Sequence, residues 1–477
     1  MQHRLIWFRD DLRVTDNAAV SAALGCDPNT RISAVFLTAE SDWASFGYGP
    51  NRLYYTQQLL THLSTSLASL GIGLTVIRLK TYHDQVAWIG QFCATECVSD
   101  LYFNQEYQWS ERLRDRQIRD NAGSVTVHAF VDRVLLQPST VLTGDERFYS
   151  VFSPFKRRWL SIYQDQGVRP FTLPVRPRVP VKPSQWPSLC DRPDSDLSQF
   201  PMTEEDAQRA LEDFVTHRLG HYDRTRNQPD VAGTSRLSGA LARGLLSPRQ
   251  CIQAAEDQIQ RPIWEFPDNA FSWINELIWR DFYQHLLVGF PRLSKNRAFR
   301  KETEALAWRN LPTEIDAWKA GRTGIPIVDA GMRELKATGW MHNRVRMVVS
   351  SLLVKHLLQD WREGASWFWD TLVDADLASN TLGWQWSAGC GADAAPYFRV
   401  FNPITQGKKF DAEGAYVRKW IPEIAKLPSK FIHEPWEAPA GILEYAGVEL
   451  GKDYPEPIID HKEGRERALA ALDQFKS

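Results

Sequence analysis

The chain has 477 residues, of which 43% are hydrophobic and 24% are charged, so it has the composition of a globular protein rather than of a disordered or fibrous one. Its 56 Lys and Arg side chains nearly balance 58 Asp and Glu, which excludes a uniformly basic nucleic-acid-binding surface but allows a local basic groove. The 19 tryptophans are unusually many, and they raise the question of whether ring stacking or electron transfer is part of the function.

Short β-rich runs alternate with helical stretches over the first third of the chain. Helices are expected over residues 17–24 and 51–70, because a glycine follows each helical pattern. Strands that alternate with helices at this spacing predict a doubly wound α/β fold with a parallel sheet. No GxGxxG sequence follows any of these strands, which disfavours a standard dinucleotide site. The expected strands are residues 5–8, 33–37, 74–79, 101–103 and 125–130.

The composition changes after this region. Eight of the 27 prolines fall between Pro170 and Pro201, a stretch that cannot hold a helix or a central strand and that indicates an extended connection. Beyond it the pattern is helical almost to the end, and Ser247 followed by Pro248 is typical of a helix start. We therefore expect an α/β domain over residues 1–132, an interdomain linker over 133–201 and an all-α domain over 202–477.

Six cysteines are scattered without the spacing of a disulfide framework or of a zinc site. Cys93 and Cys97 are four residues apart, so we interpret them as two packed thiols on one helix face. No segment approaches the roughly 18 apolar residues of a membrane helix, and charged residues stand where a signal peptide would be apolar. These features predict a soluble protein of a reducing compartment, with neither membrane nor metal.

Four segments carry polar side chains in patterns that packing alone does not explain. In the first, residues 233–238 (GTSRLS) lead from a loop into a short helix that Gly244 ends. Exposed backbone N–H groups, the hydroxyls of Thr234 and Ser235 and the cation of Arg236 would suit a phosphate or pyrophosphate. The alternative is an ordinary Ser/Thr helix cap, which this hexapeptide alone favours.

The second segment, residues 273–283, places four unlike side chains on one helix face. A carboxylate, an indole, a guanidinium and a phenol could line a polar pocket for a planar ligand, or they could form a solvated face with a partly buried tryptophan. The run from 285 to 301 adds five basic residues and no acid, a candidate phosphate-binding strip, although charge runs are usually solvated surface. The four side chains are Glu276, Trp279, Arg280 and Tyr283, and the basic residues are Arg292, Lys295, Arg297, Arg300 and Lys301.

The third segment, residues 339–347, heads an apolar helix on which Asn343 and Met347 share a face. An amide can pair with a base edge and Met offers an adaptable apolar surface, although Met347 alone would more often be core.

The fourth segment, residues 374–386, is the densest in polar side chains. Its pattern indicates a metal site or a polar cofactor pocket, and because no histidine stands at ligand spacing we do not expect a metal. Arg346 is the natural partner of Asp374, since a lone buried carboxylate would be costly. The residues concerned are Asp374, Asp376, Asn380, Trp384 and Trp386.

Taken in order, the four segments resemble those of the cryptochrome/photolyase family, and more narrowly of the bacterial class I cyclobutane pyrimidine dimer photolyases that carry a folate antenna. The resemblance extends from residues 7–13 (WFRDDLR) to about Trp436, nearly the whole chain. The sequences GTSRLS, NELIWRDFY, TGWMHNRVRM and WQW followed by APYFRVFNP make it specific in combination. It implies an N-terminal α/β antenna domain and an all-α domain that holds a U-shaped FAD.

The resemblance assigns FAD contacts residue by residue. Asn380 would face flavin N5, where an amide favours the reduced, anionic FAD that donates an electron, whereas an acid or a thiol would suit signalling relatives. Tyr222 and residues 234–238 would hold the phosphates and the ribityl chain, and residues 374–376 would lie along the rings. The implied FAD-binding residues are Tyr222, Thr234, Ser235, Arg236, Leu237, Ser238, Arg346, Asp374, Ala375, Asp376 and Asn380.

The resemblance also implies UV-damaged DNA as the partner. Glu276 and Asn343 would hydrogen-bond a flipped-out pyrimidine dimer, whose extrusion costs less than that of a normal base pair because the dimer already pairs and stacks badly. Only His342 stands where (6-4) photolyases carry two active-site histidines, which disfavours that substrate. Trp279, Trp386 and Met347 would form the apolar wall with Tyr283 nearby, and Arg226, Arg280, Arg344 and Gln406 would grip the DNA backbone.

Trp384, Trp361 and Trp308 match the tryptophan chain by which the family carries electrons from the surface to photoexcited oxidised flavin. Each tryptophan alone would be interpreted as packing, and only the joint match supports the chain.

Ser110, Glu111 and Lys295 fall where folate-binding members place their pterin contacts, which implies a 5,10-methenyltetrahydrofolate antenna. A deazaflavin or no antenna stays open, and Ser110 would equally suit the start of an ordinary helix.

In function, the resemblance implies a carbon–carbon lyase that repairs cyclobutane pyrimidine dimers in DNA by light-driven electron transfer from reduced FAD. The alternatives are a cryptochrome-type blue-light sensor without repair activity and a nicotinamide-dependent flavin oxidoreductase. Three features count against the sensor: Asn380, the residues around Glu276, and the fact that only about 40 residues follow Trp436. The missing dinucleotide motif counts against the oxidoreductase. We expect a monomer in the bacterial cytoplasm.

Overall fold

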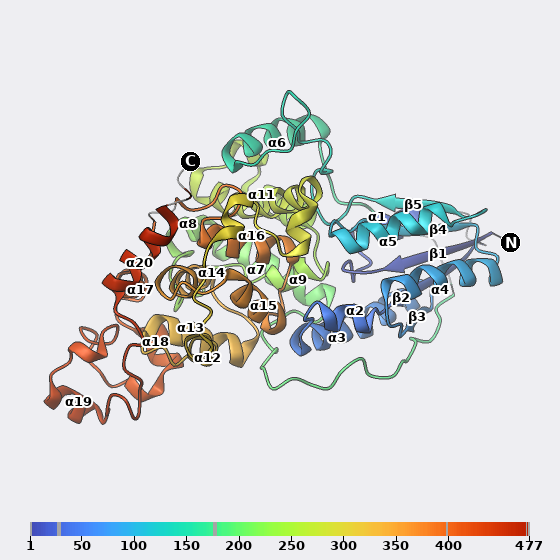
Figure 1. Cartoon of the computed structure of the whole chain (residues 1–477). Helices are drawn as coiled ribbons and strands as arrows, with labels where there is room; N and C mark the ends of the chain where they lie inside the picture. Colours follow the sequence, from blue (N-terminus) through green and yellow to red (C-terminus); the bar gives the residue numbers. More distant parts are fainter. Residues whose placement is uncertain (1, 26–29, 175–178, 397–398, 474, 476–477) are drawn as a thin grey trace.

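The structure is a computed structural model of the chain, and it describes all residues except 1, 26–29, 175–178, 397–398, 474 and 476–477. An α/β domain from the N-terminal part of the chain lies beside a larger helical domain, and an extended segment runs between them (Figure 1).

A five-stranded parallel sheet forms the centre of the α/β domain, in the order β3-β2-β1-β4-β5. The direction of strand order reverses between β1 and β4, which makes their carboxyl ends the topological switch point of the sheet. The strands confirm the predicted doubly wound fold, with ends that differ by one or two residues. They are β1 His3–Phe8, β2 Arg31–Leu37, β3 Leu74–Ile77, β4 Asp100–Asn104 and β5 Thr126–Phe130.

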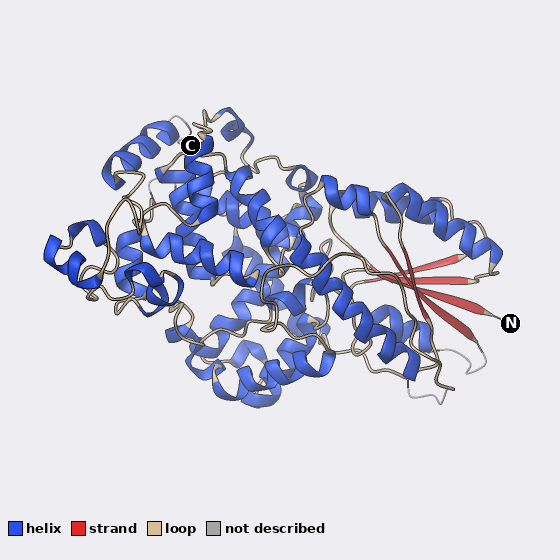
Figure 2. Cartoon of the chain, turned by 90° about the horizontal axis from the view of Figure 1, so that it is seen from below, coloured by secondary structure: helices blue, strands red, loops and turns tan. Residues whose placement is uncertain are grey.

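Alternate side chains of β1 enter two different cores. Ile6 and Phe8 pack with α1 and α3, whereas Leu5 and Trp7 pack with α4 and α5. Figure 2 shows the strands between helices on both sides. This burial of both faces explains why the strands are almost continuously apolar. The helices of this domain are α1 Ala18–Leu24, α2 Glu40–Ser45, α3 Pro50–Ser69, α4 Tyr82–Thr95 and α5 Trp109–Asp120.

The segment from 133 to 201 is not extended throughout. Helix α6 (Phe152–Gln166) interrupts it and packs on the helical domain, with the Phe155 and Phe282 rings 4.9 Å apart. From residue 168 onward its described residues form neither helix nor strand, and the N–H of Val181 donates to the carbonyl of Ala68, so this stretch runs beside α3. The domain boundaries at 132 and 201 stay predictions.

Helix α10 (Pro248–Ile259) of the helical domain begins with a cap that the sequence predicts. Ser247 Oγ accepts from the N–H of Gln250 at 3.0 Å while Gln250 Oε1 accepts from the N–H of Ser247 at 2.9 Å, which confirms the predicted helix start. The helices are α7 Glu204–His217, α8 Tyr222–Thr225, α9 Ser238–Ala242, α10 Pro248–Ile259, α11 Asp268–Gly289, α12 Pro312–Ala320, α13 Pro326–Thr338, α14 Asn343–Ser351, α15 Trp361–Thr371, α16 Leu377–Ala388, α17 Pro403–Phe410, α18 Ala415–Trp420, α19 Ala440–Ala446 and α20 His461–Asp473. A π-helical segment, η5 (Leu352–His356), follows α14, and the 3-10 helices are η1 Leu219–His221, η2 Ile263–Glu265, η3 Pro291–Lys295, η4 Lys301–Ala305, η6 Pro422–Ile424 and η7 Pro435–Glu437.

Buried ion pairs join the two domains. Arg249 of α10 donates to Asp16 at 3.0 Å and to Asp132 at 2.6 Å, and Arg13 donates to Asp132 at 2.7 Å. These side chains are at most 3% exposed, so removing one partner would leave an unpaired buried charge at a cost of about 3–5 kcal/mol. Gly244 has φ +67° and comes so close to the backbone after β1 that a Cβ would lie 2.4 Å from a carbonyl oxygen, so the interface requires glycine there.

No helix in the described part of the chain is long and apolar enough to cross a membrane. The five cysteines that the structure describes are free thiols, and Cys26 lies outside the described residues. Among the described residues, no group of three His, Cys, Asp or Glu side chains could hold a metal ion.

Candidate functional site

Helix α11 carries the four side chains of the second motif, all half-buried. The indole of Trp279 is stacked flat on Phe152 of α6, with 3.7 Å between ring centroids and 8° between planes, and Tyr283 lies 5.5 Å away. The indole is therefore fixed on one side before any ligand binds. Phe152 escaped prediction because it comes from a segment 127 residues earlier in the chain (279 minus 152) and stands in none of the four motifs.

Glu276 is paired with an arginine from another helix. Arg226, directly after α8, donates to Glu276 Oε1 at 2.6 Å, and its guanidinium lies over the ring of Tyr222 at 5.1 Å. Burial raises the pKa of Glu276, and Arg226 opposes that rise. The structure thus brings Glu276 together with Tyr222 and Arg226, two predicted site residues from another segment of the chain.

Four guanidinium groups surround His342 at the start of α14. The ring is 2% exposed, its Nδ1 accepts from the N–H of Arg344 at 3.1 Å, and its Nε2 has no hydrogen-bond partner. Because Nδ1 accepts, Nε2 carries the proton of the neutral ring. Burial, and then repulsion by the cations, lowers the pKa of His342 to about 4. The cations are Arg236, Arg346, Arg344 and Arg226, and we call this group the arginine cluster.

An electropositive region with an unused buried donor suits an anionic ligand. Sequence reasoning used His342 only to weigh the substrate class, although a histidine within one helical turn of Arg344 and Arg346 was a signal for such a region.

The loop of the first motif lies against the arginine cluster. Arg236 has φ +54°, and its guanidinium lies over the ring of Trp340 at 4.5 Å, while Trp340 Nε1 donates to Ser238 Oγ at 3.3 Å. Helix α9 begins after Leu237 without a side-chain capping bond, so the hydroxyls of this motif do not serve as an ordinary helix cap. The motif is available for a ligand at the arginine cluster.

The two carboxylates of the fourth motif have different partners. Arg346 donates to Asp374 at 2.8 Å, as expected, and the second oxygen of Asp374 is buried without a partner. Asp376 accepts from Arg133 at 2.5 Å; although burial acts to raise its pKa, Arg133 and Arg280 hold that pKa well below the usual range. Asp376 therefore forms an ion pair at the domain interface in this structure. Its predicted flavin contact stays a prediction, as does that of its neighbour Ala375.

Arg280 is turned toward the domain interface rather than outward. Its guanidinium donates to the backbone carbonyl of Arg133 and to that of Leu241, the latter at 3.1 Å. These bonds engage it inside the protein in the absence of DNA, and the predicted contact of Arg280 with the DNA backbone stays a prediction.

Two acids that follow the basic run from 285 to 301 pair with three of its five cations. Arg292 and Arg297 lie 3.5 and 4.0 Å from Glu304, and Arg300 donates to Glu302 at 2.8 Å. These three arginines are therefore engaged by carboxylates rather than left open for phosphate.

The other predicted DNA contacts lie nearer the surface. Arg344 donates to Asn227 Oδ1 at 2.8 Å and covers the ring of Phe410 of α17 at 4.6 Å, and Gln406 lies on the same helix α17. Asn343 is exposed at the start of α14, while Met347 and Trp386 are half-buried.

Asn380 is oriented by the backbone of α15. Its Nδ2 donates to the carbonyl of Ala365 at 2.9 Å, so its carbonyl oxygen is the atom left for a ligand.

The three tryptophans of the predicted chain belong to one hydrophobic core. Trp384 and Trp361 are 3% and 1% exposed and Trp308 is half-buried, so the series leads from the interior toward the surface. The indole of Trp384 packs directly on Gly364, one helical turn after Trp361, where a Cβ would lie 2.1 Å from Trp384 Cη2. This glycine lets the Trp384 indole of α16 approach α15 one turn away from Trp361.

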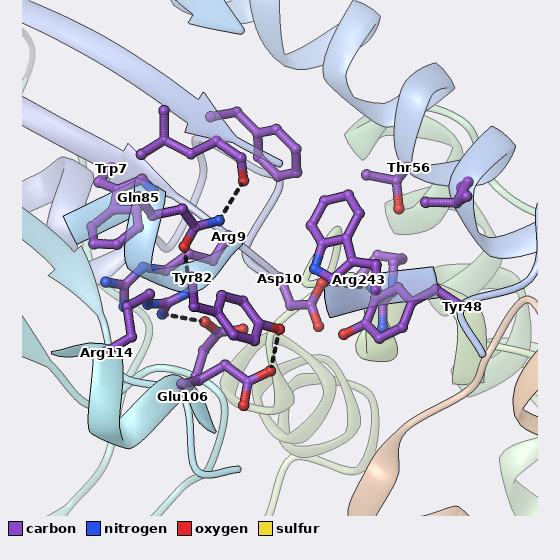
Figure 3. A pocket seen from close by; sticks show the side chains of 15 residues that line it. Trp7, Arg9, Asp10, Tyr48, Thr56, Tyr82, Gln85, Glu106, Arg114 and Arg243 are labelled. Carbon is purple, nitrogen blue, oxygen red and sulfur yellow. Dashed lines mark hydrogen bonds and ion pairs between the residues drawn. The ribbon is translucent and has the colours of Figure 1, made fainter. Parts of the chain in front are cut away.

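A separate cavity, partly open to solvent, lies at the carboxyl ends of β1 and β2 in the α/β domain (Figure 3). Trp43 and Tyr48, stacked at 5.4 Å, form part of its wall, and the Tyr82 hydroxyl donates to Glu111 at 2.7 Å. Burial, and then the charge of Glu106, raises the pKa of Glu111 to about 7. Crevices beside a topological switch point are where open α/β sheets bind ligands.

The structure separates the three predicted antenna contacts. Glu111 lines the cavity, whereas Ser110 and Lys295 do not. Lys295 of η3 lies over the ring of Trp109 at 4.4 Å, which docks η3 on the start of α5. Helix α5 has no side-chain cap, so Ser110 does not act as the capping residue that the alternative required.

Comparison with known proteins places the chain among photolyases. A family described as DNA photolyase matches residues 4–177, and one described as FAD binding domain of DNA photolyase matches residues 273–474. The deoxyribodipyrimidine photo-lyases of Escherichia coli (strain K12) and Salmonella typhimurium are 42% and 40% identical to this chain, with 99% of each chain covered. Cryptochrome-1 of Arabidopsis thaliana is 33% identical over 99% of this chain and 70% of its own.

Solved structures of photolyases and cryptochromes have the same fold as this chain. A bacterial class III photolyase from Agrobacterium tumefaciens has a TM-score of 0.87 at 37% identity, covering 99% of this chain and 98% of its own. A Synechocystis cryptochrome has a TM-score of 0.86 at 29% identity, covering 99% of both chains. With a photolyase domain, a FAD-binding domain and relatives that match over their full length, the chain belongs to the cryptochrome/photolyase family.

Proposed function

We propose that the protein repairs cyclobutane pyrimidine dimers in UV-damaged DNA by light-driven electron transfer from reduced FAD. The observation that carries the proposal is the face of α11, where the carboxylate of Glu276 stands beside an indole that Phe152 holds in place. A fixed indole offers a flat wall for flipped-out bases, and a carboxyl group can hydrogen-bond their polar edges. The full-length relatives named deoxyribodipyrimidine photo-lyase support the same activity.

The residues around His342 fit the FAD that the family's second domain binds. The Nε2–H of His342 and one oxygen of Asp374 are buried polar atoms without protein partners, which a ligand would satisfy. Arg236 of the arginine cluster would neutralise part of the charge of the diphosphate, and the hydroxyls of Thr234 and Ser235 would hydrogen-bond it. When bound and reduced, FAD supplies the electron that splits the dimer.

Asn380 would keep the reduced flavin anionic. Because its Nδ2 is bound to the carbonyl of Ala365, its own carbonyl oxygen would accept from the N–H at flavin N5. Because the carbonyl oxygen of the Asn380 amide would face the flavin, the side chain could not donate a proton to it, and the flavin ring would retain its negative charge.

Arg226, Arg344 and Gln406 would contact the DNA backbone beside the pocket, and Arg280 would join them if DNA binding released its bonds to the carbonyls of residues 133 and 241. The local arginine cluster would let a chain of net charge −2 bind DNA. Asn343, Met347 and Trp386 would complete the pocket. We further propose that the protein acts as a monomer in the bacterial cytoplasm.

Two accessory roles belong to the same proposal. Trp384, Trp361 and Trp308 would return oxidised flavin to its reduced state by passing electrons inward from the surface. The cavity at Glu111 would hold the light-harvesting antenna, for which we propose 5,10-methenyltetrahydrofolate, since a carboxyl group can pair with the amino-pyrimidine edge of a pterin.

Survival of UV-irradiated bacteria tests the function. In a strain without dimer repair by light, expression of the protein should restore survival under blue light but not in the dark. The same survival in light and dark, with the protein expressed and carrying FAD, would reject the proposal.

A further inference from the structure

We propose that, when a dimer in DNA binds, Arg226 exchanges the carboxylate of Glu276 for a backbone phosphate, and that Glu276 then takes up one proton from solvent. This inference rests on the proposed dimer site, and it adds a linkage between DNA binding and protonation.

The ion pair between Arg226 and Glu276 is open to solvent. Arg226 Nη2 lies 2.6 Å from Glu276 Oε1, and the two side chains are 27% and 36% exposed, so both water and a ligand can reach them. Glu276 therefore has one strong countercharge in the free protein, and that countercharge is held by a side chain from another helix.

The other titratable groups near α11 do not replace this countercharge. Helix α16, which packs along α11, carries no titratable side chain. The Tyr222 and Tyr283 hydroxyls lie near Glu276, and burial and then Glu276 raise their pKa values, with Asp393 also acting on Tyr283. Lys156 of α6 lies over the Phe271 ring, and Arg280 is turned to the domain interface. The groups of η1 and α8, which are His221, Asp223 and Arg224, are exposed, whereas Asp281 and His285 of α11 are buried and bonded to Trp159 and to the carbonyl of Leu136.

Electrostatic repulsion between Arg226 and Arg344 favours the movement of Arg226 from the carboxylate of Glu276 to a phosphate. Burial, and then the charge of Arg226, lowers the pKa of Arg344, which shows that the two guanidiniums repel each other. Arg344 is bonded to the neutral amide of Asn227 rather than to an acid. A phosphate between the two arginines would relieve this repulsion and offer both of them charge-assisted hydrogen bonds.

Once Arg226 has turned away, Glu276 faces the dimer without a countercharge. Burial already raises the pKa of Glu276 against the opposing effect of Arg226, and a bound dimer would exclude the remaining water. A neutral carboxylic acid is then favoured over an unpaired buried carboxylate. The neutral acid can donate its O–H to a carbonyl oxygen of the dimer, whereas a carboxylate can only accept.

The linkage has a definite sign. Because the pKa of Glu276 is higher in the complex than in the free protein, dimer affinity falls as pH rises between the two values, by up to about tenfold per pH unit for one proton. Below the pKa of the free protein, Glu276 is protonated in both states and contributes no pH dependence.

Titration calorimetry counts the proton. The FAD-loaded, full-length protein is titrated at neutral pH with an oligothymidine that carries one dimer, in two buffers of different ionisation enthalpy. We expect an uptake of about one proton by the wild type, and almost none by Glu276→Gln or with undamaged oligothymidine.

Two arginine variants test the exchange itself. Arg226→Gln removes the countercharge before DNA arrives, so part of Glu276 is already protonated and the uptake should be smaller at the same pH. Arg344→Gln removes the same charge without touching Glu276, so affinity should fall while the uptake stays near the wild-type value.

Three results would overturn the proposal although repair itself stays intact: no uptake by the wild type, equal uptake by Glu276→Gln, or unchanged uptake by Arg226→Gln. A protein that neither binds nor repairs the dimer would instead refute the proposed function, and with it the basis of this inference.

Discussion

The substitution Gly364→Ala should destabilise the protein, although a glycine-to-alanine change inside a helix usually stabilises it. In a helix interior alanine is normally more stable than glycine by about 1 kcal/mol. In α15, however, the new Cβ would lie 2.1 Å from Cη2 and 2.4 Å from Cζ3 of Trp384, far inside van der Waals contact. That indole is 3% exposed in a packed core, where inserting one carbon costs about 1–3 kcal/mol. We expect Gly364→Ala to lower the free energy of unfolding by up to about 2 kcal/mol and to displace Trp384 from its place near Trp361.

Two measurements test the expected effects of Gly364→Ala on stability and on the position of Trp384. Urea denaturation gives the free energy of unfolding, and the rate at which light reduces oxidised flavin reports the position of Trp384. The matched control is Gly90→Ala, in the middle of α4, where a Cβ meets nothing within 4 Å. It should gain about 0.5–1 kcal/mol and photoreduce like the wild type. If Gly364→Ala were as stable as this control and photoreduced at the wild-type rate, the packing argument would be refuted.

Further substitutions test the dimer pocket, the electron path and the DNA contacts. The Glu276→Ala variant should bind FAD normally but bind the dimer about fivefold more weakly, because one net hydrogen bond contributes ~1 kcal/mol. Wild-type repair by this variant would remove Glu276 from the site. Trp308→Phe should abolish photoreduction yet spare repair once the flavin is chemically reduced; a repair defect in the reduced variant would contradict the assigned role. The logarithm of DNA affinity should fall linearly with the logarithm of salt, and Arg344→Gln should reduce that slope by about one, so an unchanged slope would exclude a phosphate contact. Phe152→Ala frees the indole of Trp279 from a stacking contact of about 0.5–1.5 kcal/mol, so dimer affinity should drop about two- to tenfold while flavin absorbance is unchanged, and unaltered affinity would show that the stack is not needed.

Elements with local signals were predictable from sequence. The side chain of Asn17 accepts from the N–H of Val20 where a helix start was expected, and Ser247 forms the expected cap. The third strand ends two residues before the prediction because its partner β2 ends at Leu37, which pairs with Ile77. Strand ends depend on a neighbour that the local pattern does not contain.

The direction of charged side chains could not be predicted in this way. Arg280 shares a helix face with Glu276, yet carbonyls from residues 133 and 241 draw it to the domain interface. Asp376 likewise meets Arg133, and Glu111 is turned into the cavity by Tyr82. In each case the decisive partner is distant in sequence, so motifs identified the residues of the site but only the tertiary structure showed which of them converge.

Repair of a defined substrate decides whether the protein is a photolyase. The purified protein is reduced and mixed with an oligothymidine that carries a cyclobutane dimer, and thymine absorbance is followed under blue light and in the dark. We expect the absorbance to recover in the light only. No recovery from a protein that holds fully reduced FAD would contradict this expectation and would favour a light sensor that acts through a protein partner.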